Sequence, residues 1–76
     1  MIQDERLKKG YTQSQLSKKC GIPLSTLQKY ENGQKNINNA NLSALIRLCI
    51  ALECDLVDIL TDESLIDLIK IKDNLK

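Results

Sequence analysis

The fold is decided by residues 12–33, which read TQSQLSKKCGIPLSTLQKYENG. Thr12 can cap a helix, with Gln15 three residues later completing a capping box, and Gly21 can end that helix in the left-handed conformation. Pro23 then presets the first turn of a second helix, where its missing N–H is harmless, and Gly33 ends it. The stretch therefore predicts two short helices, at about residues 12–20 and 23–32, joined by a tight turn.

So short a turn forces the two helices to cross steeply, with the small Ser17 where their backbones approach. The apolar side chains that hold this angle are Leu16, Cys20, Ile22, Leu27 and Tyr30. The polar residues of the second helix then share the opposite face at helical spacing: Ser25, Gln28, Lys29 and Asn32. A helix that displays hydroxyl, amide and ammonium groups outward can enter a major groove and read base edges.

The flanking segments are also divided by helix signals. A short helix is predicted for residues 2–9, ending at Gly10. The polar loop after Gly33 is interrupted by Ile37, which is expected to pin the loop to the core. A fourth helix starts at Asn39 or Asn41, and its predicted apolar stripe consists of Leu42, Leu45, Ile46, Cys49 and Leu52.

Asp55 is expected to cap a short fifth helix that contains Leu56, Ile59 and Leu60. A sixth helix is predicted from Ser64 to about Leu75. Its apolar residues lie on more than one side of the helix. A helix that packs on a five-helix core needs only a single apolar stripe, so this helix has apolar surface in excess. Part of it is therefore predicted to form a two-fold dimer interface, with these candidates: Ile50, Leu65, Ile66, Leu68, Ile69 and Ile71.

Length and composition narrow the function classes. Seventy-six residues and 8.6 kDa allow one small domain, which excludes an enzyme with two lobes. Apolar residues make up 42% of the chain but aromatic residues only 3%, so Leu and Ile must build the core of an all-α fold. No segment approaches the roughly 20 apolar residues of a membrane span, and no signal pattern opens the chain. The expected location is cytoplasmic, without membrane contact.

Cysteine and histidine usage disfavours metal and redox chemistry. The chain has three cysteines, Cys20, Cys49 and Cys54, and no histidine. A four-ligand zinc site would need carboxylates at unusual spacings, and a disulfide framework would leave one thiol over. The cysteines are interpreted as small hydrophobic residues in a reducing compartment. We expect no metal, no cofactor and no enzymatic activity.

Charge is distributed unevenly along the chain. Residues 1–38 carry seven Lys or Arg against three acids, a net charge of +4, whereas residues 39–76 carry four against seven, a net charge of −3. The N-terminal half can therefore meet an anion. For Lys8, Lys9, Lys18 and Lys19 individually, a solvated face and a DNA contact remain equally open.

Three runs carry a family resemblance: residues 12–16 (TQSQL), 20–27 (CGIPLSTL) and 30–33 (YENG). Together they resemble the helix-turn-helix of the phage-repressor and Cro class, the XRE family, and the likeness extends through residues 45–52 and 58–60. The resemblance implies a compact five-helix, lambda-repressor-like DNA-binding domain at residues 1–60. Residues 61–76 then form an additional C-terminal helix and a candidate dimerisation element.

The resemblance also implies roles for individual residues. The base-reading positions are Leu24, Ser25, Gln28 and Lys29, and the phosphate-contacting positions are Thr12, Gln13, Thr26, Asn32, Lys35 and Asn36. Arg6 and Glu31 match a pair that relatives join as a partly buried salt bridge. Pro23 departs from the family by replacing a Ser or Thr cap. Leu24 offers only a methyl surface, which suits either a thymine methyl or the edge of the core.

These features favour a sequence-specific double-stranded DNA-binding transcriptional regulator, specifically a repressor that binds a palindromic operator as a homodimer through the major groove. The alternative is an antitoxin or adaptor that uses the same fold chiefly to bind a protein through its C-terminal helix, with DNA binding secondary.

Overall fold

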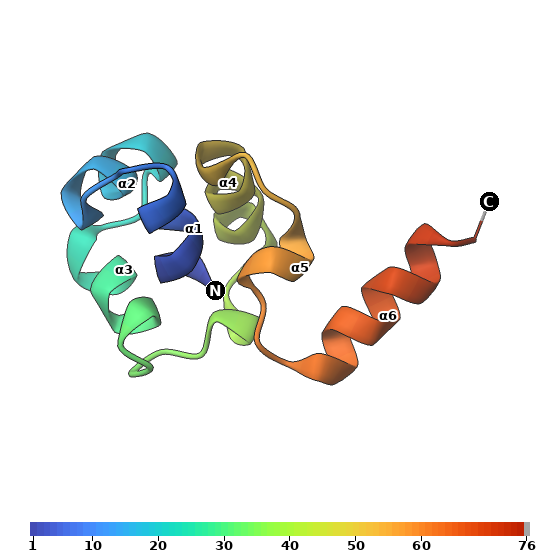
Figure 1. Ribbon diagram of the computed structural model, residues 1–76. Coiled ribbons are helices and arrows are strands. Elements are labelled where there is room, and N and C mark those ends of the chain that lie inside the picture. The colour runs from blue at the N-terminus through green and yellow to red at the C-terminus, as the bar shows by residue number, and fades with distance from the viewer. Residues whose placement is uncertain (76) are drawn as a thin grey trace.

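The computed structural model describes residues 1–75, and in that range it is built from helices without any strand (Figure 1). The elements are α1 (Ile2–Lys8), α2 (Gln13–Cys20), α3 (Leu24–Glu31), the 3₁₀ turn η1 (Ile37–Asn39), α4 (Leu42–Leu52), α5 (Leu56–Ile59) and α6 (Glu63–Asp73). The predicted all-α class is confirmed, and η1 is an element that the sequence did not predict.

Side-chain caps set the beginnings of α2 and α4. The Thr12 hydroxyl accepts a hydrogen bond from the Gln15 amide at 3.1 Å, and the Gln15 side chain accepts one from the Thr12 amide at 2.8 Å. This is the predicted capping box. Asn41 caps α4 by accepting from the Ala44 amide at 2.8 Å, so the later of the two predicted starts is the observed one.

The turn between α2 and α3 depends on Gly21, whose φ of 73° lies in the left-handed region that glycine enters without steric cost. The Ser17 hydroxyl donates to the Ile22 carbonyl at 2.6 Å, which ties the turn to α2. Pro23 has a ψ of 141° and therefore stands as the cap before α3, not in its first turn. The helix begins at Leu24, one residue later than predicted.

The core lies where helices α1 to α5 meet. The largest fully buried side chains are Leu16 of α2, Leu27 of α3, Leu48 and Leu52 of α4, and Ile59 of α5. Ile37 is only 6% exposed, so it anchors the loop after α3 as predicted. Helix α4 packs directly against α2 and so supports the α2–α3 unit (Figure 1).

The predicted buried stripe of α4 is partly wrong. Leu42 and Ile46 are 65% and 48% exposed, whereas Ala44 and Leu48, which were not part of that stripe, are buried. Leu45 and Leu52 are buried as predicted, and Cys49 is half-buried. The reason is that α4 is apolar around most of its circumference, so periodicity alone does not reveal which side faces α2.

The last helix, α6, points away from the body of the molecule (Figure 1). Leu65, Ile66 and Ile69 are half-buried and pack against the core. Leu68 and Ile71 on the same helix are 60% and 59% exposed. The predicted excess of apolar surface on this helix is therefore present. Among the described residues, no helix has both the length and the apolar character needed to cross a membrane.

Candidate nucleic-acid interface

The outward side of α3 presents the side chains that the sequence singled out for base reading. Ser25, Gln28 and Lys29 are exposed, and Leu24 is half-buried at the start of the helix. Leu27, on the opposite side, is fully buried and holds the helix to the core. Because one side of the helix is anchored in the core, its polar side is held in a fixed orientation toward solvent.

The candidate phosphate-contacting residues lie at two places around this helix. Thr12 and Gln13 are at the start of α2, with Thr12 exposed and Gln13 half-buried. Asn32, Lys35 and Asn36 are exposed in the loop after α3, and Thr26 lies half-buried within α3. The Thr12 hydroxyl already accepts the capping bond, so its proton is the part that can be donated to a phosphate oxygen.

The loop after α3 orients its amide side chains. The Asn32 side-chain oxygen accepts from the Gln34 amide at 3.0 Å, and that of Asn36 accepts from the Asn38 amide at 3.0 Å. With the oxygens used inside the loop, the NH₂ groups of Asn32 and Asn36 are the ends suited to an anion. The Lys35 ammonium lies 5.9 Å from the centre of the Tyr30 ring, a cation–π distance.

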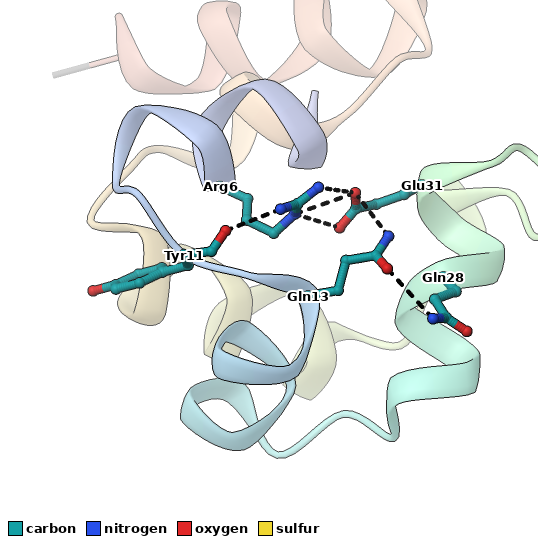
Figure 2. A network of polar contacts seen from close by, with 5 residues as sticks. All are labelled: Arg6, Tyr11, Gln13, Gln28 and Glu31. Carbon is teal, nitrogen blue, oxygen red and sulfur yellow. Dashed lines mark hydrogen bonds and ion pairs between the residues drawn. The ribbon is translucent and has the colours of Figure 1, made fainter.

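Arg6 and Glu31 form the ion pair that the resemblance implied, and it joins α1 to α3 (Figure 2). Arg6 Nη2 lies 2.9 Å from Glu31 Oε1, and Arg6 Nε lies 3.0 Å from Oε2. The two side chains are only 10% and 4% exposed. Arg6 Nη1 also donates to the Tyr11 carbonyl at 2.9 Å, so the guanidinium is bonded on several sides.

Gln13 extends this network to the surface of α3 (Figure 2). Its Nε2 donates to Glu31 Oε1 at 3.3 Å, and its Oε1 accepts from Gln28 Nε2 at 3.3 Å. These residues, with Gln3 and Asn32, line a polar hollow of about 470 Å³. The sequence predicts a phosphate-contacting role for Gln13 and a base-reading role for Gln28. It does not predict the hydrogen bond between them, which depends on how α2 packs against α3.

The two tyrosines pack against the core as predicted. Tyr11 and Tyr30 are both half-buried beside the core cluster. Lys19 Nζ lies 5.3 Å from the centre of the Tyr11 ring, a cation–π distance. Core packing, rather than stacking on bases, accounts for both aromatic residues.

The fold also brings together a group of metal-ligating residue types that the sequence did not predict. Glu5, Cys54 and Asp58 each place one donor atom within 4.8 Å of the others. Both carboxylates already have partners: Glu5 pairs with Lys8 at 3.1 Å, and Asp58 accepts from the Asp55 amide at 2.9 Å. Burial, reinforced by Cys49 and these carboxylates, raises the pKa of Cys54 to about 12. The thiol is therefore protonated near neutral pH.

All three cysteines are free thiols, Cys20 buried and the other two half-buried. Burial also raises the pKa of Cys49. A protonated thiol is a weak nucleophile, which agrees with the interpretation of Cys49 and Cys54 as small hydrophobic side chains.

Comparison with known proteins identifies the family. The family model HTH_3, described as helix-turn-helix, matches residues 2–59 and so spans α1 to α5. No curated protein and no solved structure gives a significant match. The matched region contains the α2–α3 unit, the Arg6–Glu31 ion pair and the exposed side of α3. The chain belongs to the XRE-type helix-turn-helix family of DNA-binding regulators.

Proposed function

We propose that this protein is a transcriptional repressor that binds a specific double-stranded operator by placing α3 in the major groove. The observation that carries the proposal is that Ser25, Gln28 and Lys29 are exposed on one side of α3. On the opposite side of the same helix, the fully buried Leu27 anchors it in the core. The net charge of +4 on residues 1–38 supports approach to a polyanion.

Base reading in this proposal uses different chemistry at each position. Lys29 donates to the O6 and N7 acceptors of guanine, and Gln28 pairs with adenine. Ser25 is small and can donate to or accept from a base edge. Leu24 is half-buried, so its free edge is suited to a thymine methyl group.

Phosphate contacts are proposed on both sides of α3. On one side, Gln13 and the unpaired N–H groups at the start of α2 face one strand. On the other side, Lys35 and the outward NH₂ groups of Asn32 and Asn36 face the other strand. Thr12 and Thr26 add hydroxyl donors. Such contacts hold the position of α3 without carrying sequence information.

We also propose that the protein acts as a two-fold dimer on a palindromic operator. Ile50, Leu68 and Ile71 are 71%, 60% and 59% exposed, an apolar surface that water disfavours. Dimers of this kind of unit place two recognition helices one turn of DNA apart, about 34–36 Å, and so double the contact area. The other dimer candidates, Leu65, Ile66 and Ile69, are half-buried against their own core and contribute less free surface.

A second candidate function is a protein-binding module, such as an antitoxin or adaptor, that uses the exposed apolar side of α6. The same exposure of Leu68 and Ile71 favours it. Here α6 would cover a partner protein rather than a second copy, and duplex binding would be weak.

Selection of duplexes from a random pool at physiological salt tests both functions. The repressor proposal expects one enriched palindromic sequence, and a plot of log K against log salt with a slope near −0.9 for each phosphate engaged, by the counterion-release estimate. Enrichment of no sequence would contradict it and would favour the protein-binding module. Sedimentation at tens of micromolar tests pairing, with Ile71→Asp as the variant expected to be monomeric and Asp67→Asn, on the same helix, as the control.

A further inference from the structure

The linker between α5 and α6 consists of residues 60–62. Leu60 is 6% exposed and anchors the start of the linker in the core, and its amide donates back into α5 at 3.2 Å. The other two amides, those of Thr61 and Asp62, lie after the last turn of α5 and before the first turn of α6. The partners of these two amides therefore decide the direction in which the chain enters α6.

Both amides are bound by the side chain of Asn38 in η1. Its Oδ1 accepts from the Thr61 and Asp62 amides, each at 2.9 Å. Its Nδ2 donates to Thr61 Oγ1 at 2.8 Å and to Asn36 Oδ1 at 2.7 Å. An amide side chain offers two acceptor sites and two N–H donors, so all four are used. Its orientation is fixed, because a reversed amide would turn the NH₂ group toward two backbone N–H donors.

These contacts join α6 to the loop that carries candidate phosphate contacts. Ile37, the neighbour of Asn38, is 6% exposed and anchors η1 in the core. Asn36, a candidate phosphate-contacting residue, accepts from both the amide and the Nδ2 of Asn38. The start of α6 and this loop are therefore held by the same side chain.

Beyond its first turn, α6 is held less firmly. No residue of α6 (Glu63–Asp73) is buried, and the helix points away from the body of the molecule (Figure 1). Leu68 and Ile71, in the middle and last turns of the helix, are 60% and 59% exposed. Because the helix is attached at one end, any rotation about the linker moves these two side chains relative to α3.

We propose that Asn38 is a positioning residue that fixes the direction of α6 and thereby sets the half-site spacing that the dimer accepts. This inference rests on the proposed function, in which two copies pair through α6 on a palindromic operator. Adding or removing one base pair moves a half-site by about 3.4 Å along the duplex and turns it by about 35° around the axis. Two recognition helices that rigid α6 helices hold apart can follow only one spacing, whereas loosely attached α6 helices allow several.

The first measurement needs no DNA. Residual dipolar couplings of the backbone amides compare the direction of α6 with that of residues 2–59, in the Ile71→Asp background so that pairing does not restrain the helix. With Asn38 present, the α6 couplings are expected to fit the alignment of residues 2–59. In Asn38→Ala they should fall by about half or more, because averaging over directions reduces a coupling. Asn39→Ala, at the neighbouring exposed asparagine of η1, is the matched control and should leave them unchanged.

The second measurement compares dissociation constants for the selected operator and for versions with one base pair added or removed between the half-sites. The wild-type chain is expected to prefer the selected spacing by about tenfold, and Asn38→Ala to reduce this ratio to about twofold or less. A loss caused by a displaced Asn36 acts on every spacing alike and cancels in the ratio. Circular dichroism checks that each variant is folded.

Asn38→Asp is the conservative variant. It keeps oxygen acceptors for the Thr61 and Asp62 amides and should retain most of the spacing ratio, although its charge weakens binding to all duplexes. A residue that only stabilised the loop would change affinity without changing the ratio.

Unchanged α6 couplings in Asn38→Ala would overturn the inference without reference to DNA. Equal binding of the wild type to all three spacings, or an unchanged ratio in Asn38→Ala, would overturn it while leaving the DNA-binding function intact. If selected and random duplexes bound equally well, the proposed function itself would be wrong, and with it the role of Asn38 in half-site spacing.

Discussion

Arg47 of α4 lies against Gly21 in the turn between α2 and α3. Arg47 Nη1 is 3.5 Å from the Gly21 carbonyl oxygen, to which it donates, and it is 3.0 Å from the position that a Cβ at residue 21 would occupy. Gly21 has a φ of 73°. The turn that sets the α2–α3 angle is therefore restricted by its own backbone conformation and by a side chain from α4.

Replacing Gly21 by alanine is expected to destabilise the protein by about 1–2 kcal/mol, the usual cost of a left-handed conformation for an L-residue. Gly10→Ala is the matched control, since Gly10 has the same φ of 73° but nothing within 4 Å of its added Cβ. Urea denaturation measures both. Because the tip of Arg47 can move, any additional cost at Gly21 should be small and should disappear in an Arg47→Ala background. Wild-type stability of Gly21→Ala would contradict this account.

Breaking the Arg6–Glu31 pair from one side is expected to be costly. Arg6→Met leaves the Glu31 carboxylate, 4% exposed, without its counter-ion, and such losses destabilise by about 3–5 kcal/mol. The double variant Arg6→Met/Glu31→Leu removes both charges and should recover most of the loss. The double-mutant cycle is measured by chemical denaturation. A single variant within about 1 kcal/mol of wild type would mean that water reaches the carboxylate.

Lys29 and Lys35 are expected to differ in what they contribute to DNA binding. Lys29→Ala should weaken the selected operator by about 1–3 kcal/mol and random DNA much less, because a base contact is lost. Lys35→Ala should weaken all duplexes alike and reduce the magnitude of the salt slope by about 1. Fluorescence anisotropy titrations at several salt concentrations measure both effects. Equal losses on both kinds of DNA for Lys29→Ala would place the reading face elsewhere.

The start of α6 is expected to loosen in acid. The Ser64 hydroxyl and amide, and then the Leu65 amide, donate to the Asp62 carboxylate and lower its pKa below the usual 3.8. A folded pKa below the unfolded value means that the cap stabilises fully above pH 3.8, and that this contribution is lost as the pH falls through the lowered folded pKa.

Amide exchange at Ser64 and Leu65, followed by NMR from neutral pH to below that pKa, measures the acid effect on α6. Asp62→Asn keeps an oxygen acceptor but does not titrate, so its α6 exchange should lack this pH dependence. The start of α4, capped by the uncharged Asn41, is the internal control. Parallel changes at α4 and α6 in the wild type would indicate general acid unfolding instead.

The local parts of the fold were predictable because they depend on neighbours in the chain. The Thr12–Gln15 capping box, the left-handed Gly21 and the buried Ile22 each involve residues a few positions apart, and each forms as predicted. The buried side of α4 was not predictable in this way. Leu42 and Ile46 fit the helical period as well as Ala44 and Leu48 do, and only packing against α2 distinguishes them.

By itself, the sequence determined the order and approximate extent of the α-helices, the two-helix unit around Gly21, the family, and the set of polar residues on α3, since caps, glycines and periodicity act over short range. Only the tertiary structure decided that Gln13 lies between Glu31 and Gln28, that Glu5 meets Cys54 and Asp58, and that α6 leaves Leu68 and Ile71 uncovered. The physical reason is that these relationships join separate helices, whose rotation and distance are set by the packing of the whole core.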